Sequence, residues 1–270
     1  MLNVFIPAVP IWRTMESKRN VGTIEAVERS MQIIETLRDL EGAGVTEIAE
    51  SLGWAKSTVH THLRTLEENE YVVRRGDEYV LGFPFLALGQ HVKNRERVYK
   101  AVEPKIEESA KQTGRRVQFI TNEHGYAVYV RIAEGKHAVS TGSRLGRSRV
   151  MLHASAAGKA ILAELPREEV ERILDRRGLK KFTENTITER DGLFEELETI
   201  QARGYAFNHE EHIPGLRAVA APVHDPEGDV LGSMSIAGAA RRMQGEQFKE
   251  DLPELLLGIV NEVELDLAYS

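Results

Sequence analysis

Between Thr23 and Gly82 the hydrophobic residues first recur in steps of three and four, as they do on one face of a helix. One such segment runs from Thr23 to "EGAG" at 41–44, and a second starts at Thr46, a residue type that caps helix N-termini. We expect both helices to pack through these positions. The predicted inward residues are Ile24, Val27, Met31, Ile34, Leu37, Leu40, Ile48, Ala49 and Leu52.

A third helix is predicted after the tight turn "GWAKS", with Ser57 as its N-cap and one apolar face. That face contains Val59, Leu63 and Leu66. The pattern then alternates in "YVVRR" and "EYVLG", which are separated by Gly-Asp at 76–77, a pair that favours a hairpin turn. Helix, helix, turn, helix and hairpin is the order of a winged helix-turn-helix that docks on DNA. A small helical oligomerisation module is the alternative.

Residues 83–114, which follow the hairpin, are predicted to form linker helices. Pro104 is expected to break or to begin one of them, because proline lacks a backbone N–H. Apolar residues gather in the first part, and they form either a dimer contact or an intramolecular packing face. These residues are Phe83, Phe85, Leu86 and Leu88.

A second domain is predicted over residues 115–270. "VQFITNEHGYAVYVRIAEG" alternates around a turn at Gly125, and "GLRAVAAPVHD" and "GDVLGSMSIAGA" alternate around a turn at 225–228. Helices are predicted at "ASAAGKAILAELP", at "REEVERILDRRG", at "TERDGLFEELETIQARG" with Thr188 as its cap, and at the C-terminus. This mixed order predicts an α+β domain in which helices pack on an antiparallel sheet.

Composition narrows the class of protein. The chain has 270 residues, 41% of them hydrophobic, which is enough for two domains with packed cores. The absence of cysteine excludes disulfides and thiolate metal sites and fits a reducing cytoplasm. No run approaches the roughly 18 apolar residues of a membrane span, so we expect a cytoplasmic protein. Residues 1–20 lack the basic start of a signal peptide and are expected to be a disordered extension, with Met15 as an alternative start to Met1.

The net charge of −7 argues against a generally basic nucleic-acid coat, but the stretch "WAKSTVHTHLRTL" contains no acidic residue. Residues 18–82 carry eight Lys or Arg and twelve Asp or Glu, and the acids gather at 25–50 and 67–78. Because few phosphates would be neutralised, this distribution favours site-specific binding. For Lys56 or Arg64 taken alone, a solvated side chain is the alternative. The candidate DNA-contacting residues are Thr46, Lys56, Ser57, Thr58, His60, Thr61, Arg64, Arg74 and Arg75.

No motif points to catalysis. "HASAAGKA" departs from a phosphate loop, because His153 stands where glycine is required and Ala160 follows Lys159 where Ser or Thr is required. The "HEEH" at 209–212 has metal-binding residue types, but it lies at a predicted strand end and loop rather than on a helix. The serines of the last strand have no histidine near them in sequence. We therefore predict no enzyme, no cofactor and no metal.

A small-molecule pocket is the remaining candidate site. The small residues at 154–158 open a helix whose backbone N–H groups suit an anion or a carboxylate. Ser233, Ser235 and the loop around Asn208 complete such a pocket. The alternative is that the alanines only allow the helix to approach the sheet closely.

Residues 20–268 resemble the IclR family of transcriptional regulators. The resemblance is carried by "SMQIIETL", "VTEIAESLGWAKSTVHTHLRTLEENEYV", "LHASAAGKAILAEL", "TIT" and "GYAFNHEEHIPGLRAVAAPVHDPEGDVLGSMSIAG". It implies a winged helix-turn-helix at 21–82, linker helices at 83–114, and a GAF-like effector domain at 115–270. It also implies homodimers or dimers of dimers on palindromic operators that control catabolism of small acids, aromatics or sugars.

The resemblance also implies an effector site, at Leu145, Ala156, Ala157, Asn208, Ala218, Ser235 and Ala237. Relatives that bind small α-keto acids carry Asp, Cys and a second Ser where Asn208, Ala218 and Ala237 stand here. We expect this less polar pocket to disfavour the smallest keto acids and to admit a larger or less charged ligand.

The sequence thus predicts a ligand-responsive, DNA-binding transcription regulator. Two other classes stay open: a small-molecule binding protein whose winged helix only mediates assembly, and a metal-dependent enzyme built on the second domain. The first predicts no sequence-selective DNA binding. The second predicts stoichiometric metal retained through purification.

Overall fold

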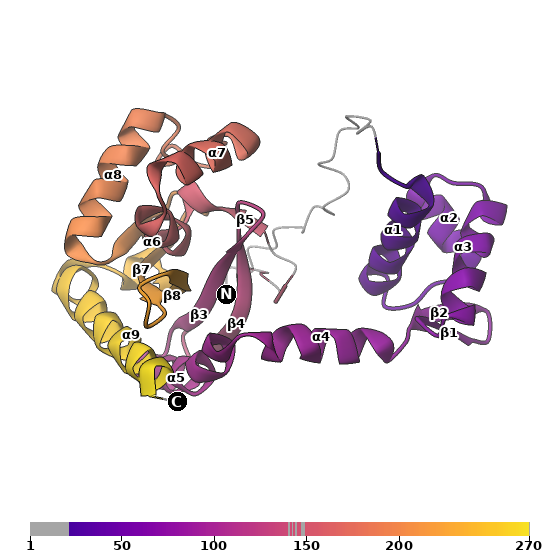
Figure 1. Ribbon diagram of the computed structural model, residues 1–270, viewed down its shortest axis with the longest axis horizontal. Helices are drawn as coiled ribbons and strands as arrows, with labels where there is room; N and C mark the ends of the chain where they lie inside the picture. Colours follow the sequence, from indigo (N-terminus) through magenta and orange to yellow (C-terminus); the bar gives the residue numbers. More distant parts are fainter. Residues whose placement is uncertain (1–21, 140, 142, 144, 147–148, 270) are drawn as a thin grey trace. The chain divides into compact units, whose positions relative to one another are not determined.

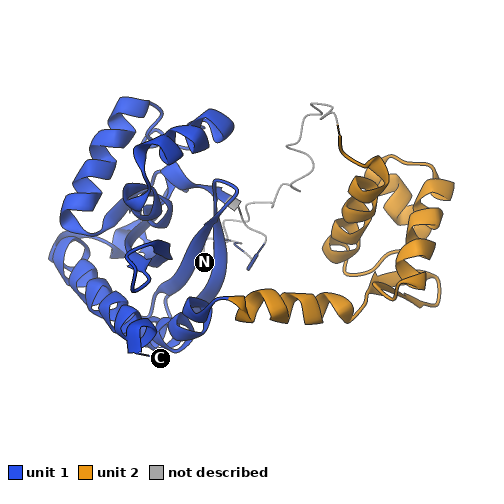
Figure 2. Cartoon of the chain, viewed as in Figure 1, with its two compact units in different colours: residues 1–8, 96–270 blue, residues 9–95 orange. Residues whose placement is uncertain are grey.

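The computed structural model describes residues 22–139, 141, 143, 145–146 and 149–269. The described chain divides into two compact units, with the division between Arg95 and Glu96 (Figure 2). The expectations for residues 1–20 and for a start at Met15 lie outside the described residues. Within the described part of the chain, no helix has the length and hydrophobicity to cross a membrane.

Three helices and a hairpin build the N-terminal unit, followed by one more helix (Figure 1). Its core is formed by apolar side chains from all three helices and from the hairpin, among them Ile33, Ile48, Leu63 and Tyr79, each at most 5% exposed. A β-bridge between Ala43 and Tyr79 ties the loop before the second helix to the wing. The elements are α1 (Glu25–Asp39), α2 (Val45–Leu52), α3 (Lys56–Glu68), β1 (Val72–Arg75), β2 (Glu78–Leu81) and α4 (Pro84–Arg95).

Three helix caps differ from the sequence prediction. The extended cap residue is Gly44 before α2 and Ala55 before α3, so Thr46 and Ser57 lie inside the first turn. Likewise α8 (Arg190–Arg203) begins after Glu189, and Thr188 does not cap it. In each case the last residue with extended backbone is not the nearest Ser or Thr, because the preceding turn fixes where the backbone becomes helical.

The inward face predicted for the first helix is wrong over its first half and at Leu40, which is 38% exposed. Ile24, Val27 and Met31 are 69%, 52% and 57% exposed, whereas Ile33 and Leu37 are buried. The C-terminal half of α1 packs on α3 and β2, and the N-terminal half extends beyond that core. The described residues of this unit therefore leave an apolar stripe of Ile24, Val27 and Met31 exposed.

The segment 83–114 divides between the two units. Helix α4 has no buried residue, although the ring of Phe85 packs edge-on against Tyr71 at 5.2 Å. Helix α5 (Arg97–Thr113) packs on the sheet of the C-terminal unit and has Pro104 in its interior, so Pro104 neither breaks nor begins a helix. Proline costs one backbone hydrogen bond there, but apolar residues buried before and after it keep α5 continuous.

The C-terminal unit is a six-stranded antiparallel sheet, in the order β5-β4-β3-β8-β7-β6, with helices on both faces (Figure 1). Helices α5 and α9 pack together on one face, and α6 and α8 pack on the other. The predicted α+β architecture is confirmed. The elements are β3 (Arg116–Glu123), β4 (Tyr126–Glu134), β5 (Arg149–Met151), α6 (Ala156–Glu164), α7 (Arg167–Arg177), α8, β6 (Ala206–His209), β7 (Leu216–His224), β8 (Val230–Ala239) and α9 (Leu252–Tyr269).

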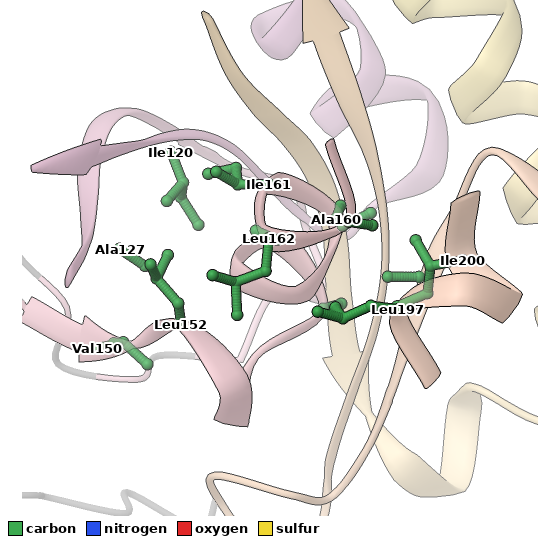
Figure 3. Packing of buried hydrophobic residues seen from close by; sticks show 14 of the residues in the cluster. Ile120, Ala127, Val150, Leu152, Ala160, Ile161, Leu162, Leu197 and Ile200 are labelled. Atoms are coloured by element: carbon green, nitrogen blue, oxygen red, sulfur yellow. The ribbon is translucent and has the colours of Figure 1, made fainter. Parts of the chain in front are cut away.

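Helix α6 lies deep in this unit, where Ile161 and Leu162 pack with Ile120 of β3 and with Leu197 of α8 (Figure 3). The approach is close at Gly158, where a Cβ atom would lie 2.2 Å from the carbonyl oxygen of Leu152. The absence of a side chain at Gly158 therefore lets α6 lie close against the 3-10 turn Leu152–Ala154 that precedes it. Helix α6 also packs on strands β7 and β8 of the sheet.

His224, at the end of β7, lies between carboxylates from two helices. Its Nε2 is 3.3 Å from Oε2 of Glu164 in α6, and its Nδ1 is 3.0 Å from Oε1 of Glu264 in α9. Hydrogen bonds to Glu164 and then to Glu264 outweigh the effect of burial and raise the pKa of His224 from 6.5 to about 9. The charged imidazolium thus links helices on opposite faces of the sheet.

We expect His224→Gln to remove a pH-dependent part of the stability. Because the folded pKa lies above the unfolded one, this contribution is complete below pH 6.5 and is lost as the pH rises through about 9. The three side chains are 23–32% exposed, so we expect about 1–2 kcal/mol. Urea unfolding of the wild-type protein and of His224→Gln, at a pH below 6.5 and at a pH above about 9, measures the difference in the free energy of unfolding. If the substitution lowers this free energy equally at the two pH values, the assignment is contradicted.

Candidate functional site

The outer face of α3 carries most of the predicted DNA-contacting residues. Lys56, Ser57, His60, Thr61 and Arg64 are exposed, while Thr58 is half-buried. The hydroxyl of Thr61 donates to the carbonyl of Ser57 at 2.9 Å, and Nε of Arg64 lies 2.9 Å from Oε1 of Glu68. Arg64 is therefore held by an acid one helical turn away on α3, two residues beyond the acid-free stretch.

The inner side of α3 is fixed to α1. Nδ1 of His62 lies 2.9 Å from the hydroxyl of Ser30. Burial, and then the charge of Arg29, lower the pKa of His62. Arg29 in turn lies over the ring of Trp54 at 5.5 Å, in the turn that precedes α3. These contacts give α3 a defined orientation on the unit, which a helix that reads base edges needs.

The wing and the start of α2 hold the other candidates. Nε of Arg74 donates to the carbonyl of Gly76 at 2.9 Å, and its guanidinium lies 6.0 Å from the ring of Tyr79. Arg75 is exposed and pairs in register with Glu78, and Thr46 is exposed in the first turn of α2. All nine predicted positions thus lie in one compact unit, and eight of them are exposed.

A cavity in the C-terminal unit gathers six of the seven predicted effector residues. Ala156 and Ala157 come from α6, Asn208 from β6, Ala218 from β7, and Ser235 and Ala237 from β8. Leu145 does not line this cavity, and its side chain is 55% exposed. The cavity holds about 40 Å³, which is room for a few water molecules.

Besides Ser155, five further polar residues line the same cavity, and the sequence analysis assigned none of the five to an effector site. Arg116 and Gln118 project from β3, where they alternate with Val117 and Phe119 of the opposite face. That alternation was visible in the sequence, but it is also the pattern of an ordinary half-exposed strand. The five are Arg116, Gln118, Tyr129, Thr141 and His212.

A hydrogen-bonded row runs across two strands of the cavity wall. Nε of Arg116 donates to Oε1 of Gln118 at 3.0 Å, and Nε2 of Gln118 donates to the hydroxyl of Ser235 at 3.0 Å. A second guanidinium nitrogen of Arg116 pairs with Glu134 on the neighbouring strand. Arg116 and Ser235, 3% and 1% exposed, are thus held in fixed positions.

The N-terminus of α6 forms the facing wall. Ser155 caps the helix, and its hydroxyl accepts from the N–H of Gly158 at 3.0 Å. The first N–H groups of a helix have no acceptor within the helix. The backbone of Ala156 and Ala157 therefore presents donors, at the positive end of the helix dipole, to the cavity that they line.

The loop after β6 is braced by a buried ion pair. Nζ of Lys159 lies 2.9 Å from Oε1 and 2.8 Å from Oε2 of Glu211, and 3.3 Å from Oε1 of Glu196. Asn208 donates to the carbonyl of Ala154 at 2.8 Å and accepts from the backbone N–H of Glu211 at 3.2 Å. Lys159 of the "HASAAGKA" motif and Glu211 of the "HEEH" motif thus form an ion pair with each other. The backbone of Glu211 in turn positions Asn208 at the cavity.

His212 adds a neutral polar ring to the cavity. Burial, and then the charge of His153, lower its pKa to about 4, and its ring packs edge-on against Phe182 at 4.7 Å. Among the described residues, no group of three or more His, Cys, Asp or Glu is placed to hold a metal ion.

Family models match both units. The model of the bacterial transcriptional regulator IclR C-terminal domain matches residues 90–263, and that of the IclR helix-turn-helix domain matches residues 26–76. The chain belongs to the IclR family. It is a transcriptional regulator with a helix-turn-helix and an effector-binding domain rather than an enzyme, so these sequence predictions are confirmed.

Individual IclR relatives agree over nearly the whole chain. The probable HTH-type transcriptional regulator ArcR of Halobacterium salinarum is 30% identical over 255 residues, which cover 93% of this chain and 95% of that protein. The crystal structure of the Thermotoga maritima IclR superposes with a TM-score of 0.78 at 30% identity, and covers 92% of this chain and 100% of that one. An IclR homologue from Microbacterium hydrocarbonoxydans, complexed with 4-hydroxybenzoate, shares the fold with a TM-score of 0.76 at 21% identity; the match covers 91% of this chain and 100% of that one.

Proposed function

We propose that this IclR-family regulator binds operator DNA through α3 and the wing, and that a small organic effector in the C-terminal cavity changes this binding. The genes under control are those for catabolism of a small acid, an aromatic or a sugar-derived metabolite. The observation that carries the proposal is the cavity, because six residues from four elements converge on it and its polar groups are held in place.

The DNA contacts are assigned by exposure and chemistry. Lys56, His60 and Arg64 supply cationic or donor side chains along the outer face of α3, and short hydroxyls at 57 and 61 lie between them. Such side chains suit phosphate oxygens and base edges in the major groove. The wing arginines Arg74 and Arg75 are assigned to the flanking backbone or groove.

The oligomer is assigned from uncovered apolar residues. In the N-terminal unit Ile24, Val27 and Met31 of α1 are exposed, as are several apolar residues at the start and along α4. We propose that a second copy covers these residues, which gives a homodimer, or a dimer of dimers, on a palindromic operator in the cytoplasm. The exposed apolar residues around α4 are Phe83, Leu86, Leu88 and Val92.

Effector binding in the cavity changes DNA binding by shifting the equilibrium between two conformations of the protein. Strand β3 carries cavity residues on one face and packs against α5 with the other, and α5 continues from α4 in sequence. An effector that favours one packing of β3 on α5 therefore favours one setting of the two α3 helices over their half-sites.

Fluorescence anisotropy with the DNA upstream of the protein's own gene tests the proposal. Titration with salt and unrelated competitor DNA is expected to show selective binding that weakens with salt. Equal affinity for operator and competitor DNA across the salt range would instead favour a binding protein whose winged helix only mediates assembly.

We expect Glu68→Gln to strengthen DNA binding severalfold. The carboxylate of Glu68 holds Arg64 at 2.9 Å and adds negative charge beside the proposed DNA face. Its removal frees the guanidinium and lessens repulsion of phosphates, worth about 0.5–1 kcal/mol. Glu184→Gln, the same charge change in the C-terminal unit, is the control. Unchanged or weaker affinity of Glu68→Gln would place α3 outside the DNA contact.

A further inference from the structure

The cavity contains one unusual group, the guanidinium of Arg116. The side chain is 3% exposed, so its charge is removed from water. A buried charge is costly unless partners satisfy it. Arg116 has such partners on two of its three nitrogens: Gln118 accepts from Nε, and Glu134 pairs with Nη1.

The third nitrogen of Arg116, Nη2, is buried and has no acceptor among the described residues. Nearly all buried polar groups in proteins find a partner, so an unsatisfied one at a cavity wall calls for an explanation. Glu134 does not supply it, because its carboxylate contacts Nη1 and makes no hydrogen bond to Nη2. A bound group that accepts hydrogen bonds does supply it.

The rest of the wall favours a negative charge. No Asp or Glu is among the described residues that line the cavity, and Arg116 is the one side chain there with a permanent charge. Burial raises the pKa of Tyr129, which keeps its hydroxyl protonated, and the low pKa of His212 keeps that ring neutral. The donors of Ala156 and Ala157 lie at the positive end of α6.

We propose that the effector is a monocarboxylic acid with an apolar body, and that Arg116 binds its carboxylate through Nη2. This inference rests on the proposed function and names the chemical class of its ligand. Arginine donates from a planar fork that matches a carboxylate, and the bond is strengthened by both charges. Because Arg116 is the one permanently charged side chain among the described residues of the wall, the cavity favours a monocarboxylic acid over a dicarboxylic acid.

The apolar body is assigned from the remaining lining residues. Ile120, Val150, Ile213 and Leu216 contribute hydrocarbon to the cavity. At about 40 Å³ the cavity has room for a carboxylate-sized group, and a larger body requires side chains to move apart. Of the two expectations drawn from Asn208, Ala218 and Ala237, a larger or a less charged ligand, this proposal agrees with the larger one and departs from the less charged one. Those substitutions remove polar groups, but Arg116 contributes a positive charge that the sequence analysis did not assign to the site.

Pairs of acids and their neutral amides test the proposal directly. The probes are acetate, butyrate, benzoate and 4-hydroxybenzoate, each against its primary amide, titrated by calorimetry into the full chain. We expect at least one acid to bind the wild-type protein at least about tenfold more tightly than its amide. Equal binding of every acid and its amide, or no binding by any acid, overturns the proposal.

Two variants assign the discrimination to Arg116. Arg116→Gln is expected to lose at least about tenfold in affinity for the acid while the amide binds as before. Arg131→Gln is the matched control, because Arg131 is a buried arginine on the same sheet that pairs with Glu103 of α5 and does not line the cavity. If Arg116→Gln keeps the acid preference, Arg116 is not the anchor. If it does not fold, the acid and amide pairs on wild-type protein still decide.

Operator binding, measured on the same preparations, separates this inference from the proposed function. Selective DNA binding without acid preference overturns the carboxylate anchor and leaves the regulator intact. Acid preference without selective DNA binding supports the anchor and removes the regulatory role.

Discussion

Replacing Lys159 with methionine is expected to lower the free energy of unfolding of the C-terminal unit by about 3–5 kcal/mol. The ammonium group is 2% exposed, and it lies within 2.9 Å of both oxygens of Glu211, which is itself 5% exposed. Methionine matches the hydrocarbon part of lysine but leaves the buried carboxylate of Glu211 without its cation and close to that of Glu196, which among the described residues keeps only Arg203, at 3.4 Å. The cost arises from these uncompensated charges rather than from the lost contact itself.

The two units allow an internal control. The chain has two tryptophans, Trp12 and Trp54, and Trp54 packs against the core of the N-terminal unit. In a Trp12→Phe background, tryptophan fluorescence then follows the N-terminal unit while far-UV circular dichroism follows both. Urea unfolding of Lys159→Met should shift only the transition of the C-terminal unit.

The double variant Lys159→Met with Glu211→Gln separates charge from packing. Removing the second charge is expected to restore part of the lost stability, because the amide needs no cation. A loss below about 1 kcal/mol in the single variant, or no recovery in the double one, would show that the pair is not a stabilising brace. Because Glu211 also positions Asn208, we expect the single variant to weaken effector binding as well.

Periodicity predicted most helices and strands of this chain, because helices repeat their apolar residues every three to four positions and half-buried strands repeat them every two. The alternation around Gly125 and around residues 225–228 became the hairpins β3–β4 and β7–β8. Both turns contain a glycine with positive φ, Gly125 and Gly228, a conformation that a glycine adopts at little cost. The same two patterns predicted α3 and the β1–β2 hairpin.

Positions that depend on which surface covers an element were predicted less well. The stripe of Ile24, Val27 and Met31 has the spacing of a buried face, but the unit's own core reaches only the second half of α1. Spacing shows that a face is apolar and does not show what covers it. Pro104 was misassigned for a related reason: tertiary packing of α5 outweighs one missing hydrogen bond.

The effector cavity contains residues of both kinds: some were predicted from local sequence patterns, and others depend on what covers the strand. The small residues of α6 were visible as a motif, and the resemblance to the family supplied six positions that the structure gathers. Arg116 was not found, because an arginine on an alternating strand normally faces water. Here the sheet is covered on both faces, so the polar positions of β3 face a closed interior. Arg116 becomes a candidate effector-binding residue only when its burial and its place in the cavity wall are known from the structure.

Arg64→Ala is expected to weaken operator binding by about 1–3 kcal/mol for each half-site that an α3 helix contacts. The side chain is exposed on the face of α3 that also carries Lys56 and His60, and among the described residues its guanidinium pairs with Glu68, itself exposed. In a dimer on a palindromic operator the loss is counted twice, which makes this the largest expected effect on DNA binding. Fluorescence anisotropy with operator DNA measures it. Arg172→Ala, which removes an exposed arginine from α7, is the control for charge.

The pattern of loss across DNA sequences tells what Arg64 contacts. If it donates to a guanine, the variant loses discrimination at that base pair, and operators changed there bind wild-type and variant proteins alike. If it contacts a phosphate, affinity falls evenly for all sequences, and the slope of log affinity against log salt decreases by about one per contact. Unchanged affinity would remove Arg64 from the interface. The acid-free stretch of α3 would then need another explanation, with the positive charge of the wing carrying the binding instead.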